Sequence, residues 1–140
     1  MPKYIDTPTI TLETALEAVE AAVRIGAEQG VRVISTVVDP GLELVAFGRA
    51  DGATPHSVET SGRKARTAAS TRRATGWMEG DFATQAPLGT GLLLTNIRGG
   101  VPIVFDGRIV GGLGVAGGTP SQDAEIAAAV LSAIKAEAVE

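Results

Sequence analysis

Two pairs of short apolar runs, each joined by a tight-turn signal, constrain the fold of this chain more than any other feature of its sequence. Asp39-Pro40-Gly41 separates the first pair, and Asp106-Gly107, a dipeptide typical of two-residue hairpin loops, separates the second. Apolar, β-branched runs around such turns predict antiparallel hairpins. The four runs are Val31 to Val38, Leu42 to Gly48, Val101 to Phe105 and Arg108 to Val115. The sequence therefore predicts an antiparallel sheet.

Helical segments are predicted before, between and after the hairpins. The first helix starts behind Thr11, a good N-terminal capping residue, and Gly30 is placed to end it. Its predicted apolar stripe consists of Leu12, Leu16, Val19 and Val23. A second helix runs from about Pro55 to Arg73. These helices are expected to cover the faces of the sheet.

The last third of the chain continues the pattern. A final helix opens after Gly117-Gly118-Thr119-Pro120, with Ile126, Val130 and Ile134 on its buried side. The stretch Gly76 to Gly91 is interpreted as a short helix and loop. Leu92 to Leu94 forms either a short strand or the wall of a pocket. The sequence shows no internal repeat or linker, so residues 1–140 are expected to form one domain with a leader at residues 1–8.

Composition excludes several classes of function. The chain has no cysteine, which rules out disulfides, thiolate zinc sites and a cysteine nucleophile. The net charge of −4 argues against a nucleic-acid partner, since binding a phosphate backbone needs a cationic face. No apolar run approaches the ~20 residues that span a bilayer. The first residues also lack the apolar stretch of a secretory signal, so a cytoplasmic location is expected.

The second helix is unusual because small residues and a lysine occupy one of its sides. Ser57, Ser61, Lys64 and Ala68 fall on one stripe, while Arg63, Arg66 and Arg73 lie on another side and are expected to be solvated. Lys64 is interpreted in three ways: it extends to water, it points into a cavity, or it lies at a subunit contact. If it is buried, its pKa should be lowered, and it is then suited to binding an anion or transferring a proton.

His56 is the only histidine, so a site with several histidine ligands is excluded. It is either an exposed residue at a helix start or the one conventional imidazole base of the chain. Any acid–base chemistry must come from a few groups, namely Asp39, Asp51, His56 and Lys64.

The glycine-rich run from Val110 to Gly118 does not predict a dinucleotide loop, because most of it lies inside a predicted strand. Glycine inside a strand marks a bulge or the close approach of another backbone. The Gly117-Gly118 corner is different because it leads into a helix N-terminus. Either its free N–H groups hold a carboxylate or another anion, or Ser121, Gln122 and Asp123 cap the helix themselves.

Taken together, these motifs resemble the GlcG/HbpS family, over roughly residues 9 to 137. The resemblance is carried by Val37 to Phe47, Asp51-Gly52-Ala53, Ser57, Lys64-Ala65 with Thr67-Ala68, Gly99 to Ile103, Gly111 to Val115 and Gly117 to Asp123. The same domain is found at the C-terminus of PduO-type corrinoid adenosyltransferases. The resemblance implies a profilin-like three-layer α-β-α sandwich with a five-stranded antiparallel sheet, in a homo-oligomer. Some members of the family bind haem.

Three functions are compatible with these residues and this resemblance. The first is binding of haem or a related tetrapyrrole, with His56 as the iron ligand and Lys64 or nearby arginines pairing with the propionates. Met78 and Tyr4 are weaker candidates for the iron ligand. The second is acid–base catalysis of a lyase, isomerase or hydrolase type on a small carboxylate or carbonyl metabolite. The third is a non-catalytic sensor or assembly module.

Each hypothesis assigns roles to the same few residues. For an enzyme, His56 or Asp51 supplies the acid or base and Lys64 holds the anion. The predicted ligand-binding residues are His56, Ser57, Lys64, Gly117 and Gly118. Haem is the one cofactor that the resemblance implies.

Overall fold

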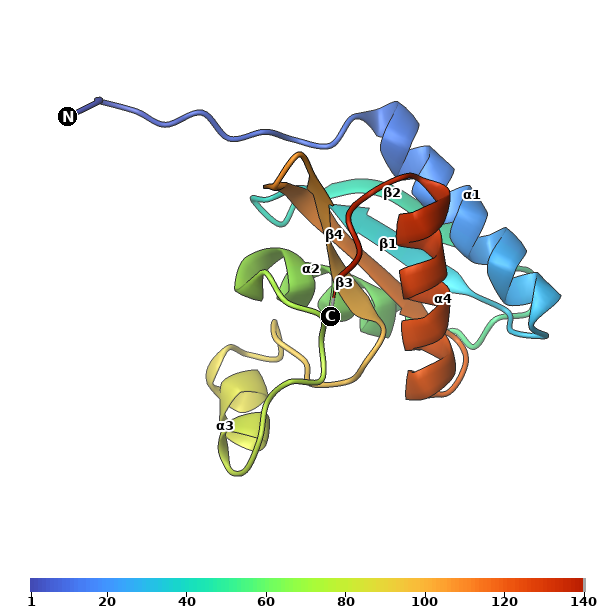
Figure 1. Ribbon diagram of the computed structural model, residues 1–140. Helices are drawn as coiled ribbons and strands as arrows, with labels where there is room; N and C mark the ends of the chain where they lie inside the picture. Colours follow the sequence, from blue (N-terminus) through green and yellow to red (C-terminus); the bar gives the residue numbers. More distant parts are fainter. Residues whose placement is uncertain (140) are drawn as a thin grey trace.

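The computed structural model describes residues 1–139, which are built around an antiparallel sheet of four strands (Figure 1). The strands are β1 (Ile34–Val38), β2 (Leu44–Arg49), β3 (Gly100–Phe105) and β4 (Arg108–Ala116). Their order across the sheet is β2-β1-β4-β3, so each hairpin forms one half and β1 pairs with β4 at the centre. Both predicted hairpins are therefore confirmed.

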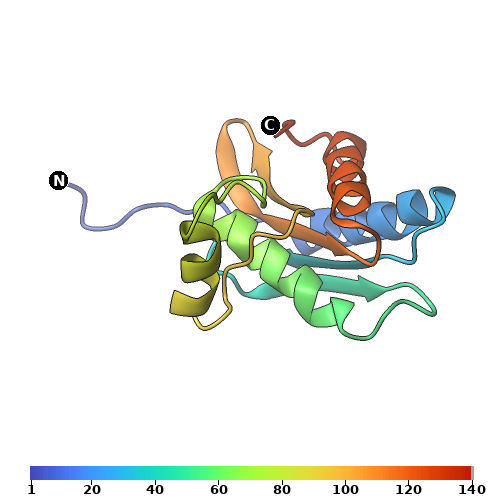
Figure 2. The same cartoon turned by 90° about the horizontal axis from the view of Figure 1, so that it is seen from below.

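The helices form layers on both faces of the sheet (Figures 1 and 2). Helices α1 (Leu12–Glu28) and α4 (Pro120–Ala133) pack side by side on one face, where the main hydrophobic core lies. Helix α2 (Ser57–Thr71) covers the other face, and the short α3 (Phe82–Gly89) projects beyond it. None of the helices in residues 1–139 is long and apolar enough to cross a bilayer.

The predicted apolar stripe of the first helix is partly wrong. Leu12 and Leu16 are 57% and 43% exposed, whereas Val19 is buried. Alanines, including Ala15, Ala18 and Ala22, fill the buried side instead. A face of alanines lets α1 lie close to the sheet and to α4, and this rotates the two leucines outward. On the last helix, the buried positions Ile126, Val130 and Ile134 are as predicted.

Helix α2 meets the sheet almost backbone to backbone. A Cβ atom on Gly112 would collide with the carbonyl oxygen of Ala65, and one on Gly114 with that of Ser61. Small helix residues thus face strand glycines, and Thr36 Oγ1 on β1 forms a buried 2.7 Å hydrogen bond with Ser61 Oγ. The interpretation of the strand glycines as points of close backbone approach is confirmed.

The expectation of a fifth strand is wrong, since the sheet has four. Leu92 to Leu94 turns back on α3: Leu92 N–H donates to the carbonyl of Pro87 and Leu93 N–H to that of Thr90. Leu92 has a φ of 67°, which is incompatible with an extended strand. No fifth strand pairs with β3 within residues 1–139. Instead, two single hydrogen bonds reach this strand: Thr75 N–H donates to the carbonyl of Gly100, and Glu137 N–H donates to the carbonyl of Val104.

Replacing Gly114 by alanine tests the close contact of α2 with the sheet. The new methyl group has to displace the backbone at Ser61, so the free energy of unfolding should fall by about 1–3 kcal/mol, the typical cost of overpacking a core. Gly89→Ala is the control, because nothing lies within 4 Å of a Cβ there. Urea unfolding followed by circular dichroism measures both variants. Equal midpoints for G114A and the unmodified protein would contradict the proposed packing.

Candidate functional site

Lys64 is buried and crosses the end of the sheet from the α2 layer to α4. Only 1% of the residue is exposed, and its Nζ donates to the carbonyl of Val115 and to Asp123 Oδ2, both at 2.9 Å. Burial lowers the pKa of Lys64, while the hydrogen bond and the negative charge of Asp123 oppose that shift. This direction is the one expected for the pKa of a buried lysine. The side chain neither reaches water nor lines any of the four main cavities of residues 1–139.

The N-terminal end of α2 holds the other predicted site residues. His56 is exposed at the N-cap position, and its side chain makes no capping hydrogen bond. Ser57 is buried, and its hydroxyl forms a 2.6 Å hydrogen bond with that of Thr54. Asp51 is exposed in the preceding loop. His56 and Lys64 are eight positions apart, which is about 12 Å along a helix axis, so the structure does not bring them together.

The Gly117-Gly118 corner is capped by its own chain. Gly118 N–H donates to Asp123 Oδ1 at 2.8 Å, and Thr119 and Gln122 form a reciprocal capping box at the start of α4. Of the two alternatives left open by the sequence, the structure shows self-capping. Both glycines line a cavity of about 390 Å³ that also contains Arg32 and Thr54.

Asp39 stabilises the hairpin turn through its carboxylate. One of its carboxylate oxygens, Oδ1, accepts from the N–H groups of Gly41 and Glu43 at 2.8 and 3.0 Å. This arrangement is an Asx-type turn, in which the side chain replaces a backbone acceptor. Among residues 1–139, no three carboxylate or histidine side chains gather into a metal site.

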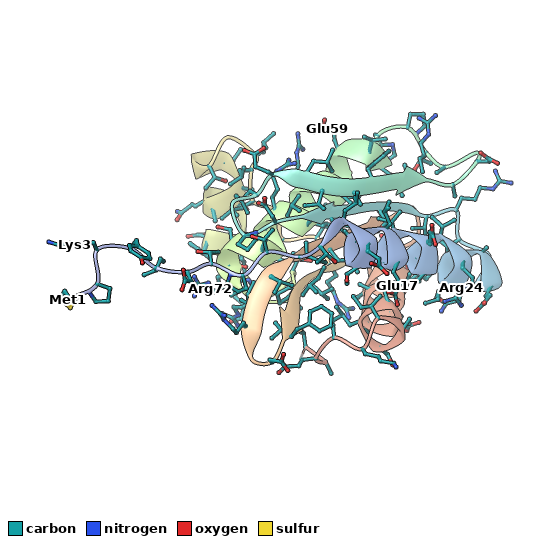
Figure 3. All side chains as sticks on the ribbon, turned by 90° about the horizontal axis from the view of Figure 1, so that it is seen from above. Met1, Lys3, Glu17, Arg24, Glu59 and Arg72 are labelled. Atoms are coloured by element: carbon teal, nitrogen blue, oxygen red, sulfur yellow. The ribbon has the colours of Figure 1, made fainter. Side chains whose placement is uncertain are left out.

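The largest of the four main cavities of residues 1–139 lies at the opposite end of α2, where the leader meets both hairpin turns. We call it the hairpin-end cavity. Its volume is about 620 Å³, and it is lined by Ile5, Asp6, Thr7, Pro8, Pro40, Gly41, Leu42, Ala69, Ser70, Arg72, Gly107, Arg108 and Ile109. Figure 3 shows Arg72 close to the base of the extended leader.

Sequence reasoning missed Arg72 and Arg108 as site residues, although a signal for them exists. Arg72 ends α2 in a left-handed conformation, with a φ of 61°, and Arg108 follows the Asp106-Gly107 turn. Both therefore stand at chain reversals, and the antiparallel arrangement puts these two reversals at one end of the sheet. Within residues 1–139, neither arginine forms an ion pair.

Comparison with known proteins gives consistent matches. The family model of haem-degrading HbpS-like proteins matches residues 10–132. A 15.0 kDa protein encoded between dhaT and dhaS in Citrobacter freundii is 34% identical over 137 residues, covering 94% of this chain and 96% of that protein. The GlcG protein of Escherichia coli K12 is 44% identical over 80 residues, which are 56% of this chain and 60% of GlcG.

Solved structures share the same fold. Klebsiella pneumoniae ORFY superposes with a TM-score of 0.88 at 28% identity, covering 96% of this chain and 97% of ORFY. HbpS superposes with a TM-score of 0.83 at 32% identity, over 93% of each chain. PduOC, solved as a complex with haem, has a TM-score of 0.86 over 94% of this chain and 99% of PduOC. Its identity is 24%, so this last likeness concerns the fold alone.

A double-mutant cycle on Lys64 and Asp123 tests whether their contact couples the two helix layers. Lys64→Met leaves a buried carboxylate without its cation and should cost about 3–5 kcal/mol of unfolding free energy. Asp123→Asn removes the charge but keeps an oxygen for Gly118 N–H. The double variant should be more stable than the sum of the single effects predicts, by at least about 1 kcal/mol. Strict additivity in urea unfolding would show that the two side chains do not interact.

Proposed function

Because this chain belongs to the family of haem-degrading HbpS-like proteins, we propose that it binds haem or a related tetrapyrrole. The observation that carries the proposal is the hairpin-end cavity. Its volume of about 620 Å³ falls within the range of about 300–1,000 Å³ typical of small-molecule sites. The same fold holds haem in PduOC, which supports the view that this architecture has room for a tetrapyrrole.

The residues of the cavity fit the macrocycle and its carboxylates. Pro8, Pro40, Leu42 and Ile109 offer apolar contact to a flat ring, and Arg72 and Arg108 are the natural partners of two propionates. When bound, haem would supply the redox chemistry of its iron. The lining contains no histidine, methionine, cysteine or tyrosine, so the cavity fits the periphery of haem and offers no conventional side-chain ligand to its iron.

His56 stays a prediction as iron ligand, and its position makes it unsuited to the hairpin-end cavity of its own chain. The residue precedes α2, whereas Arg72 follows it. Sixteen helical positions correspond to about 24 Å, far beyond the length of an iron–nitrogen bond. His56 can therefore ligate only a tetrapyrrole bound elsewhere, at the exposed start of α2. Haemin binding should therefore survive His56→Ala if the ligand lies in the hairpin-end cavity, and should be lost if the ligand lies at the start of α2.

The enzyme hypothesis has less support from the geometry. The groups predicted to bind the anion of the substrate have partners within the chain. Lys64 pairs with Asp123, and Gly118 N–H donates to the same carboxylate. Arg32, in the 390 Å³ cavity, and Asp51, in the neighbouring loop, remain as candidates for such chemistry. The exposed Leu44 and Phe47 on the edge strand β2 favour the homo-oligomer that the resemblance implies.

Titration with haemin tests the proposed function. We expect a saturable Soret shift, together with quenching of the fluorescence of Trp77, the only tryptophan. His56→Ala should bind haemin as the unmodified protein does, because His56 lies about 24 Å away along α2. Absence of any saturable shift would refute tetrapyrrole binding. A shift that is lost in H56A would preserve the function and place the site at the start of α2.

A further inference from the structure

We propose that the hairpin-end cavity recognises tetrapyrroles through their two carboxylates, by Arg72 and Arg108, and that binding does not require iron. The ligand class is then the dicarboxylate tetrapyrroles, including metal-free porphyrins. This inference rests on the proposed function and specifies how the same site selects its ligand.

Arg72 is held in place by the end of α2. Its N–H donates to the carbonyl of Ala68, which closes the last turn, and its left-handed backbone turns the chain away from the helix. The side chain is exposed and, within residues 1–139, makes no ion pair or side-chain hydrogen bond. Ser70 and Ala69, one turn earlier, line the same cavity and add little bulk. The guanidinium is therefore available to a ligand.

Arg108 approaches the cavity from the β3–β4 hairpin. Its guanidinium donates a hydrogen bond of 3.4 Å to the backbone carbonyl of Asp6 in the leader. This bond is long and involves a neutral acceptor, so it leaves the charge unpaired. A carboxylate forms shorter, bidentate bonds with a guanidinium and would displace so weak a contact.

The charges of the cavity favour a ligand with two negative groups. Its charged lining residues are Arg72, Arg108 and Asp6, and no ion pair joins Asp6 to either arginine. Two cations against one anion leave the site net positive in a chain whose overall charge is −4. A ligand with one carboxylate would leave one arginine unmatched. The rest of the lining is mostly small or apolar and suits the face of a macrocycle.

Iron adds little to the affinity of such a site. None of the lining residues carries a nitrogen or sulfur group of the kind that ligates haem iron. The binding free energy must then come from burial of the ring and from the carboxylate–arginine pairs. A porphyrin without metal presents the same ring and the same two carboxylates, so it should bind with similar affinity.

The experiment compares haemin, protoporphyrin IX and protoporphyrin IX dimethyl ester, using Trp77 quenching and the porphyrin spectra. Haemin and protoporphyrin IX should have Kd values within about threefold, and the ester should bind at least tenfold more weakly. Arg72→Gln and Arg108→Gln should each weaken both acids about tenfold, which corresponds to about 1.4 kcal/mol. Arg49→Gln is the matched control, because Arg49 is exposed on β2 and is absent from the cavity lining.

The outcomes separate this inference from the proposed function. If neither haemin nor protoporphyrin IX binds, the proposed function itself is wrong. If haemin binds and protoporphyrin IX does not, the iron is ligated and the carboxylate mechanism is overturned while haem binding stands. If both bind but R72Q and R108Q behave like R49Q, the ligand occupies another site. Circular dichroism of all variants verifies that these exposed substitutions leave the fold intact.

Discussion

The contact between the backbone of α2 and the glycines of β3 and β4 is the constraint on which the rest of this structure depends. Gly100, Gly112 and Gly114 present no side chain to α2, so the backbone carbonyls of Lys64, Ala65 and Ser61 lie directly against them. Dispersion contacts between closely packed backbones are individually small but numerous. This close packing positions both ends of α2: His56 and Ser57 stand at its start, and Arg72 at its far end lines the hairpin-end cavity.

The same close approach explains the buried ion pair. At the level of Lys64 the helix lies against Gly99 and Gly100, and the lysine side chain passes these glycines to reach Asp123 in the other helix layer. Burying two charges costs several kcal/mol of hydration, which offsets much of the attraction between them. Asp123 also accepts from Gly118 N–H, and one carboxylate therefore fixes α2, α4 and the turn that joins β4 to α4.

Local sequence patterns predicted the elements of this fold well, because the turns, caps and strand glycines act over a few residues. The hairpins at Asp39 and Asp106, the cap at Thr11 and the tight packing of the glycine run all follow from short-range chemistry. The partner of Lys64 was missed because Asp123 is 59 positions away and in the opposite layer. The prediction of a fifth strand was wrong because the N–H groups of Leu92 and Leu93 donate to the carbonyls of Pro87 and Thr90 at the end of α3. These N–H groups are then not free to pair with a neighbouring strand.

The arrangement of the site residues also depends on contacts between distant parts of the chain, which local sequence patterns do not predict. His56 precedes α2 and Lys64 lies within it. The sequence alone does not decide whether the two share a pocket, and the rise of the helix separates them along its axis. Arg72 and Arg108 are 36 positions apart, and only the antiparallel topology brings the end of α2 to the β3–β4 turn. The imidazole at the start of α2 therefore lines none of the four main cavities of residues 1–139, and the hairpin-end cavity at the far end of the helix has no imidazole. For the tetrapyrrole that we propose as ligand, the volume of the hairpin-end cavity and its unpaired arginines favour recognition through the carboxylates over recognition through the metal.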